Sequence, residues 1–284
     1  MKGQNFLEED WDYAIIFDAA RYDVFSQLYD DYFEGELEKR KSRASATPEW
    51  AAKVFEGRHR MNYFSTNPFI NSIGMSLRQV GDVNYDVVPA DHITNIIDLW
   101  DVAWDDEIGT VRPEDVNRQF RKRRDDLDGA RTVIHYMQPH VPFLGRGKGR
   151  LNAHLKKSFS KLKTNGGTNG VISDQIAEVM PDIISRMEDM ELFMKLGLYS
   201  SLDKRSLLQV VSGESTEKLM EFHRENQRKV MEEAKKLVED LEGDVIITSD
   251  HGDAFGEQGV WGHHIEKHIP PLVEVPWLEV EGVN

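Results

Sequence analysis

The sequence of 284 residues contains no cysteine. This absence excludes disulfide bonds, metal sites built from thiolates and a cysteine nucleophile. Long apolar stretches are also missing, because no run reaches the roughly 18 apolar residues that indicate a membrane-spanning helix. The residues after Met1 are polar and acidic and show no apolar segment typical of a signal peptide. We therefore expect no membrane span and, by default, a cytoplasmic protein.

Basic residues are in the minority. Lys and Arg number 35 against 50 Asp and Glu, so the formal net charge is -15 at pH 7. A protein of this charge is not expected to bind nucleic acid through a general basic surface. An anionic substrate would instead need a local positive site or a metal ion to offset its charge.

Short apolar segments alternate with amphipathic ones along most of the chain. We expect strands at 13–17, 61–66, 131–137 and 244–249, with 83–88 as a further candidate and a last strand at 272–280, where Pro276 favours an edge or a bulge. We expect helices at 19–32, from Thr47 onward, at 113–124 and at 214–241, with a basic loop at 39–46. The alternation predicts one α/β domain over residues 1–284, a three-layer sandwich with a mainly parallel central sheet.

Residues 144–212 have a different character from the rest of the chain. Glycines and basic residues dominate the stretch from Arg146 to Lys163, and helical patterns follow at about 171–196 and 203–211. We interpret this region as a mostly helical insertion within the single domain, serving as a lid or a specificity element. Its basic residues either bind a phosphorylated or sulfated polymer or form a solvated loop.

Acidic residues and histidines follow the predicted strands at the points where the strands end. Asp18 follows the first strand, His140 comes shortly after the 131–137 strand, and Asp250 and His251 directly follow the late strand. Thr47 begins a helix, and it is a residue type that favours the N-cap position. Ligands of open α/β sheets bind beyond the carboxyl ends of the strands, so these side chains are expected to lie close together.

The side chains at the strand ends are of the types that bind divalent metals. Carboxylate, imidazole and hydroxyl groups suit zinc, manganese or magnesium, and imidazole favours the transition metals. A hydroxyl at a helix N-terminus can be activated by a metal and attack a phosphoryl group. Taken alone, the Asp250-His251-Gly252 triplet is equally consistent with a turn cap.

Four blocks of the sequence resemble the alkaline phosphatase superfamily, on its sulfatase-like branch. The Asp-His-Gly block, followed by Gly-Glu-x-Gly-x-Trp-Gly, is similar to a sulfatase pattern, and the blocks fall in the family's order. They lie at residues 15–23, at 46–50, at 135–143, and at 248–252 continuing to 262–263.

The resemblance implies a role for each matching residue. Asp18, Asp250 and His251 would bind the metal, and Thr47 would be both a ligand and the nucleophile. His140 would contact the transferred group. These five positions carry the family's chemistry as it stands in this sequence.

Two further residues are candidates for substrate binding. His263 stands where sulfatases have a substrate-contacting lysine. It would either contact the substrate as an imidazolium or protonate the leaving group. Arg21 would either bind the phosphate or form an ion pair with an acidic neighbour.

The nucleophile position departs from the sulfatase pattern. Sulfatases use a formylglycine made from Cys or Ser, and Thr47 cannot become one. A threonine is what the phosphate-transferring members of the superfamily use. The resemblance therefore predicts a metal-dependent hydrolase or transferase that acts on a phosphate ester or phosphodiester. The alternatives are a sulfatase without formylglycine and a non-catalytic relative that binds a glycan or polyanion.

The number of metal ions is left open. One ion would be held by Asp18, Thr47, Asp250 and His251. A second ion would draw on residues from the set His140, His263, His264, His268 and Asp253. Zinc or manganese is favoured over magnesium or calcium. The expected partner is an anionic phosphate- or sulfate-bearing small molecule, glycan or lipid head group, and the oligomeric state is not predicted.

Overall fold

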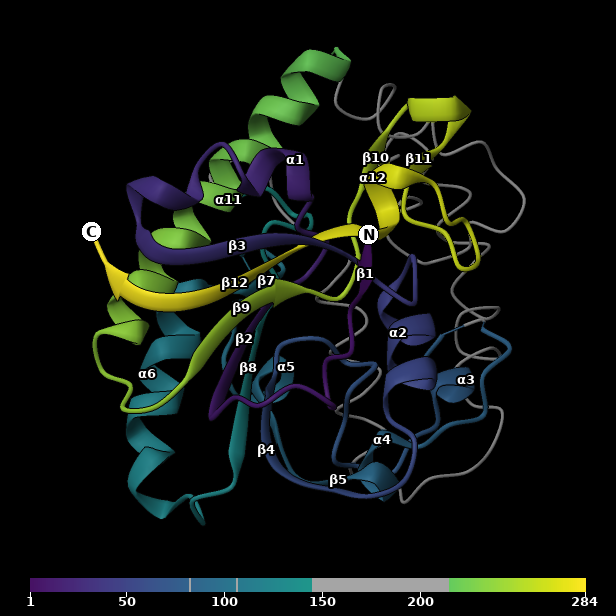
Figure 1. The fold of residues 1–284 in the computed structure, drawn as a ribbon. Coiled ribbons are helices and arrows are strands. Elements are labelled where there is room, and N and C mark those ends of the chain that lie inside the picture. The colour runs from purple at the N-terminus through teal and green to yellow at the C-terminus, as the bar shows by residue number, and fades with distance from the viewer. Residues whose placement is uncertain (82, 106, 145–214) are drawn as a thin grey trace.

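A computed structural model describes residues 1–81, 83–105, 107–144 and 215–284 (Figure 1). The strands are β1 (Lys2–Gly3), β2 (Tyr13–Phe17), β3 (Phe33–Lys41), β4 (His59–Ser65), β5 (Ile93–Asp98), β6 (Trp104–Asp105), β7 (Thr110–Val111), β8 (Arg131–Tyr136), β9 (Val245–Ser249), β10 (Ala254–Phe255), β11 (Trp261–Gly262) and β12 (Glu274–Val283). The α-helices are α1 (Tyr22–Phe25), α2 (Thr47–Val54), α3 (Leu77–Val80), α4 (Pro89–His92), α5 (Leu99–Val102), α6 (Pro113–Arg123), α11 (Thr216–Val238) and α12 (Pro270–Val273). Short 3-10 helices lie at η1 (Tyr29–Asp31), η2 (Arg124–Asp126) and η3 (Glu257–Gly259).

The centre of the fold is an eight-stranded sheet in the order β1-β3-β12-β9-β2-β8-β4-β5. From β9 to β5 every neighbouring pair is parallel, whereas β12 is antiparallel to both β3 and β9. The central parallel strands β2, β8 and β9 are short and almost fully buried, as strands covered on both faces are expected to be. The predicted α/β fold with a mainly parallel sheet is confirmed.

Helices cover both faces of the sheet and complete the three layers. Helices α6 and α11 lie on one face, and α2 lies on the other (Figure 1). Each face has its own apolar core: Phe120 and Val230 belong to the first, and Trp50 and Tyr63 to the second. The carboxyl ends of the parallel strands therefore open at one edge, between the two helical layers.

Strand β3 is the main element that the sequence analysis missed. Residues 39–46 were expected to form a loop, but the chain is in β3 as far as Lys41. Its sequence is mostly charged, which hides the apolar alternation by which a strand is recognised. The strand is stabilised by pairing along its length with β12 and by Arg40, whose guanidinium carbon lies 3.9 Å from the ring centroid of Trp277.

Two other local predictions were wrong. Residues 83–88 form no strand and lead into α4. The helix expected at 19–32 is reduced to the single turn of α1 and to η1, and β3 begins directly afterwards. Tyr22 and Phe25 suggested helical spacing, but Phe25 is buried because it packs against the sheet, in the core that contains Phe17.

The last strand is an interior strand, contrary to the expectation that Pro276 placed it at an edge. Strand β12 lies between β3 and β9. Pairing with β9 runs only from Trp277 to Val280, so Pro276 precedes the part of the strand that has neighbours on both sides. The missing N–H of proline is tolerated at such a position. A register shift lies between Val280 and Gly282, beyond the proline, so Pro276 itself lies neither in an edge strand nor at a bulge.

The proposed insertion at 144–212 lies outside the described residues, apart from Leu144. Within the part of the chain that the structure describes, no helix has the length and apolar character needed to cross a membrane.

We predict that Gly35 tolerates a side chain much less well than Gly57 does. A Cβ atom at Gly35 would lie 2.0 Å from the carbonyl oxygen of Glu279 in β12, whereas a Cβ at Gly57 meets nothing within 4 Å. Both glycines have positive φ, of 151° and 78°. Gly57→Ala should lower the free energy of unfolding by roughly 1–2 kcal/mol through backbone strain alone. Gly35→Ala should lower the free energy of unfolding, measured by urea denaturation, by clearly more. Equal losses for the two variants would contradict the β3–β12 pairing.

Candidate active site

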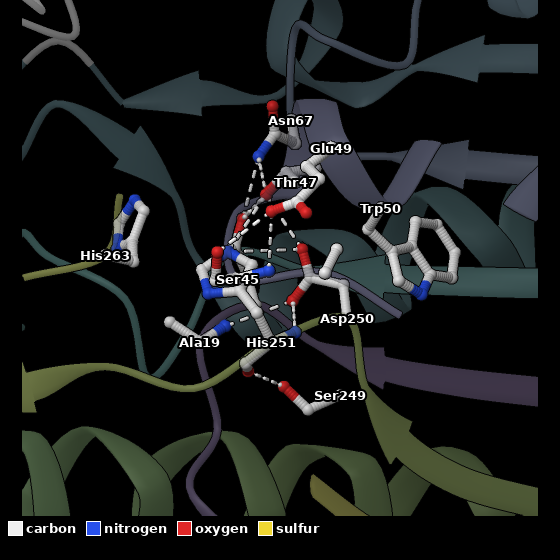
Figure 2. A network of polar contacts seen from close by, with 12 residues as sticks. Ala19, Ser45, Thr47, Glu49, Trp50, Asn67, Ser249, Asp250, His251 and His263 are labelled. Carbon is white, nitrogen blue, oxygen red and sulfur yellow. Dashed lines mark hydrogen bonds and ion pairs between the residues drawn. The ribbon is translucent and has the colours of Figure 1, made fainter. Parts of the chain in front are cut away.

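The residues predicted at the strand ends do converge, and Figure 2 shows Thr47, Asp250 and His251 directed toward one another. Asp18 follows β2, Asp250 and His251 follow β9, and Thr47 is the first residue of α2. A fifth residue, Asn67, joins them from the end of β4. None of these side chains is more than 8% exposed.

Thr47 was expected to be the N-cap of α2, but it is the first residue inside the helix. Ala46 takes that position, with φ -162° and ψ 152°, and no side chain caps the helix from there. The threonine hydroxyl is consequently released from capping and bonds to the site instead. Glu49 accepts a hydrogen bond from the backbone N–H of Ser45 at 3.0 Å and so supports the helix start in its place.

The hydroxyl of Thr47 lies at the centre of the cluster. Its Oγ1 donates to Oδ2 of Asp250 at 2.8 Å and accepts from Nδ2 of Asn67 at 3.2 Å. Nε2 of His251 lies 3.3 Å from the same oxygen. Oδ2 of Asp18 lies 3.5 Å from it and accepts from Asn67 at 2.8 Å. A hydroxyl has one proton to donate, and Asp250 is placed to receive it.

Asp18, Asp250 and His251 can hold a metal ion. Each offers one ligand atom, and these atoms all lie within 4.8 Å of one another. Oδ1 of Asp18 is buried without a hydrogen-bond partner and lies 3.6 Å from Nε2 of His251. Nδ1 of His251 lies 2.7 Å from the carbonyl oxygen of Gly252, to which it donates, so the Nε2 lone pair faces the carboxylates. These donors fit a divalent cation.

The two carboxylates have opposite pKa shifts. Burial, reinforced by the charge of Asp250, raises the pKa of Asp18 well above its usual range. Burial would also raise the pKa of Asp250, but His251, His135 and the hydroxyl of Thr47 outweigh it and lower that pKa. Two adjacent carboxylates in a low-dielectric site favour one ionised and one neutral form unless a cation offsets their charge.

The glycine of the Asp-His-Gly block is required by a close backbone contact. A Cβ atom at Gly252 would lie 2.0 Å from the carbonyl oxygen of Pro271. The N–H of Gly252 donates to the carbonyl of Leu272 at 2.8 Å. This contact fixes the peptide that orients the ring of His251.

His140 and His263 lie beside the metal-ligand candidates. The ring of His263 is centred 4.6 Å from that of His251 and 4.9 Å from that of His140. Its Nδ1 lies 3.3 Å from Oδ1 of Asp253. Burial and the neighbouring His251 lower the pKa of His263 to about 3, although a quarter of its side chain is exposed. The neutral ring is thus the favoured form at neutral pH, which argues against a permanent imidazolium.

Arg21 takes part in ion pairs rather than facing Thr47. It is 4% exposed, and its Nη2 lies 2.7 Å from Asp23 while Nη1 lies 2.6 Å from Glu257. Nη1 also donates to the carbonyl of Asp253 at 3.1 Å. The structure thus favours the ion-pair alternative for Arg21 over binding of a phosphate.

The candidates for a second metal separate into two groups. Asp253 and His263 contact each other next to His251. His268 instead donates to Oε1 of Glu49, in the first turn of α2, at 2.7 Å. The carbonyl of His264 accepts from the hydroxyl of Ser45. His264 and His268 thus join the loop at 264–268 to the start of α2.

Three polar residues near the site were missed or undervalued by the sequence analysis. Asn67 lies shortly after the end of β4, and polar residues at the carboxyl ends of parallel strands are expected to line a site, so this position could have identified it. Glu49 is fully buried and bonds Ser45, Lys53 and His268. His135 was expected to be a packed core residue; it is fully buried, and its Nε2 also lies 4.0 Å from Oδ2 of Asp250. Nothing local in the sequence marks the contacts of Glu49 and His135.

Comparison of the sequence with models of protein families finds no match, and comparison with curated proteins finds none. Comparison with solved structures finds similar folds. The soluble domain of lipooligosaccharide phosphoethanolamine transferase A from Neisseria meningitidis has a TM-score of 0.50 at 9% identity, over 94% of this chain and 75% of that chain.

Two further structures have lower scores. The C-terminal periplasmic domain of phosphoethanolamine transferase EptC from Campylobacter jejuni has a TM-score of 0.46 at 11% identity, over 94% of this chain and 77% of that chain. Phosphonate monoester hydrolase from Silicibacter pomeroyi has a TM-score of 0.47 at 14% identity, over 93% of this chain and 66% of that chain. At such identities the likeness to the first structure establishes the fold alone.

We predict that Asp18→Asn stabilises the metal-free protein at neutral pH. Because the pKa of Asp18 is raised in the folded state, ionised Asp18 lowers the stability of the fold. This loss is absent below the ordinary aspartate pKa of 3.8 and grows as the pH rises towards the folded-state pKa. Asparagine removes that loss. The thermal midpoint of the chelator-treated variant should therefore exceed that of the parent protein at neutral pH, and the difference should vanish at acidic pH.

The control for this measurement is Asp86→Asn, at an exposed position. It removes the same formal charge from a chain of net charge -15 and so reports the general relief of repulsion. If Asp18→Asn raises the thermal midpoint no more than Asp86→Asn does, burial of ionised Asp18 does not destabilise the metal-free protein, contrary to this prediction.

Proposed function

We propose that this chain, whose fold is that of the alkaline phosphatase superfamily, is a metal-dependent enzyme that hydrolyses or transfers a phosphate ester or phosphodiester. The resemblance predicted from the sequence is confirmed in the fold. The observation that carries the proposal is the position of the Thr47 hydroxyl, 2.8 Å from Asp250 and 3.3 Å from His251 within a buried group of donors that fits a cation.

The ion would be held by Asp18, Asp250, His251 and the oxygen of Thr47. When bound, it would offset the paired carboxylate charge, lower the pKa of the threonine hydroxyl and stabilise negative charge on the phosphoryl oxygens. An imidazole together with carboxylates favours zinc or manganese over magnesium or calcium. A second ion would draw on Asp253 and His263, which lie next to His251.

The chain's own groups account for the movement of protons and bonds. Thr47 Oγ1 forms the bond to phosphorus as its proton moves to Oδ2 of Asp250, and the bond from phosphorus to the leaving oxygen breaks. Asn67 directs its Nδ2 at the reacting oxygen and would bind a phosphoryl oxygen placed there. We assign contact with the transferred group to His140 and His263, and the leaving oxygen takes a proton from solvent. Water or an alcohol then attacks phosphorus and gives its proton to solvent, the bond from phosphorus to Oγ1 breaks, and Oγ1 regains its proton from Asp250.

The side chain at position 47 favours phosphate over sulfate, because threonine cannot be converted to formylglycine. A non-catalytic role is disfavoured by the position of the Thr47 hydroxyl oxygen, which lies 2.8 Å from Oδ2 of Asp250 and 3.5 Å from Oδ2 of Asp18. The proposed substrate is an anionic phosphate-bearing small molecule, glycan or lipid head group. One protein of similar fold is by name a transferase acting on lipooligosaccharide. Nothing in the fold supports the cytoplasmic location expected by default, so the proposal includes no compartment.

We predict that Thr47→Ala lowers kcat on a nitrophenyl phosphodiester by about 10³-fold or more, because the nucleophile is lost. Thr47→Ser keeps the hydroxyl and should retain activity far above that of the alanine variant. Assays with added zinc or manganese, across nitrophenyl phosphate, phosphodiester and sulfate substrates, measure this directly. Rapid quenching followed by mass spectrometry should detect phosphate on residue 47 of the parent enzyme. Full diesterase activity of Thr47→Ala would rule out the proposed mechanism.

A further inference from the structure

Helix α11 carries three fully buried polar side chains, and two of them, His223 and Asn226, hydrogen-bond to other parts of the chain. They are three residues apart, so they lie on the same face of the helix. A polar group at such depth destabilises the fold unless it is hydrogen-bonded. Their partners therefore indicate what these residues do, and in both cases the partners belong to loops that carry candidate site residues.

Asn226 holds the backbone of the loop after β8. Its Oδ1 accepts from the N–H of Leu144 at 2.8 Å. Its Nδ2 lies 3.3 Å, 3.4 Å and 3.2 Å from the carbonyl oxygens of Pro139, His140 and Pro142. These partners fix the orientation of the amide, because the reverse orientation would place the oxygen against three carbonyl oxygens. Asn226 thus closes the loop from both of its ends.

The backbone of His140 is consequently fixed on both sides. Its N–H donates to the carbonyl of Asp18 at 3.1 Å, and its own carbonyl faces Asn226. Its ring nitrogen Nδ1 lies 2.5 Å from the carbonyl of Val141, to which it donates. This bond leaves Nε2 as the nitrogen that can act on a substrate, and the ring stands beside that of His263.

His223 supports the opposite side of the site. Its Nε2 donates to the carbonyl of Ala19 at 3.1 Å. Ala19 has a φ of 63°, a conformation that is unfavourable for alanine, and its N–H donates to Oδ1 of Asp250 at 3.2 Å. One helix therefore braces both the loop that follows Asp18 and the loop that carries His140.

We propose that Asn226 is a positioning residue for the reaction, acting through His140. This inference rests on the proposed function, in which His140 contacts the transferred group. Rotation or slippage of the 139–144 loop would move the imidazole relative to Thr47, and misplacement of a reacting group by about 1 Å can lower the rate by about 10²-fold. If Asn226 only maintained the fold, its substitution would lower stability, and the accompanying loss of activity would not depend on whether His140 is present.

The test is a double-mutant cycle between Asn226→Asp and His140→Ala, measured as kcat/KM on a phosphodiester in the metal-supplemented full chain. Asn226→Asp keeps the size and the acceptor for Leu144 but places an acceptor-only oxygen against three carbonyls. We expect it to lower kcat/KM by roughly 10–100-fold, the usual effect of losing an outer-shell partner. The double variant should be no less active than His140→Ala, within about two-fold.

The control variant is Lys229→Ala, on the same helix. Lys229 donates to the carbonyl of Leu144 at 2.6 Å but does not bond the peptides beside His140 that Asn226 holds. We expect it to leave kcat/KM within about two-fold of the parent value. Asn226→Ala, which adds no repulsive oxygen, replaces Asn226→Asp if the latter shows a reduced circular dichroism signal.

The outcomes separate this inference from the proposed function. Multiplicative losses in the double variant, in an enzyme whose activity still depends on Thr47, would overturn the role of Asn226 and leave the proposed function intact. Activity that survives Thr47→Ala would instead overturn the proposed function. The expected result is a double variant about as active as His140→Ala, in an enzyme whose activity depends on Thr47.

Discussion

The site depends on two carboxylates, Asp18 and Asp250, that the fold holds together in its interior. Strands β2 and β9 are parallel neighbours in a register that pairs Phe17 with Ser249, so the residues that follow both strands emerge at the same point. Burial and the nearby charge of Asp250 raise the pKa of Asp18, whereas His251, His135 and Thr47 lower the pKa of Asp250 in spite of its burial. Two adjacent buried carboxylates lower the stability of the fold by themselves, and a bound cation would offset this loss of stability.

The surrounding structure supplies donors to this pair. Asn67 donates to Asp18, Thr47 donates to Asp250, and the strained peptide of Ala19 directs its N–H at Asp250. Behind these contacts lie groups that hold the peptides in place: His223 at Ala19, and Gly252, whose backbone packs against Pro271. The contacts link β2, β4, β9, α2 and α11, which explains why the site lies where the two helical layers meet the carboxyl ends of the strands.

The elements that bear the candidate ligands could be predicted from the sequence, and so could helix α11, but strand β3 and the contacts of the supporting side chains could not. The segments that became β2, β8 and β9 are apolar and end in Asp or are followed closely by His, so strand pattern and chemistry agree there. Strand β3 was missed because its stability comes from pairing with β12 rather than from its own charged residues. The roles of Asn67 and Glu49 depend on partners distant in sequence, which no local pattern encodes. Arg21 illustrates the same limit, since its choice between phosphate and carboxylate depends on where Glu257 lies.

The most direct test of the account is a crystal structure of the protein soaked with zinc or manganese, with anomalous scattering used to locate the ion. The account predicts an anomalous peak bounded by Asp18, Asp250, His251 and the oxygen of Thr47, at about 2.0–2.2 Å from its nitrogen and oxygen ligands if the ion is zinc. An ion bound elsewhere, or no peak among these residues at saturating metal, would contradict the assignment of this cluster as the metal and nucleophile site.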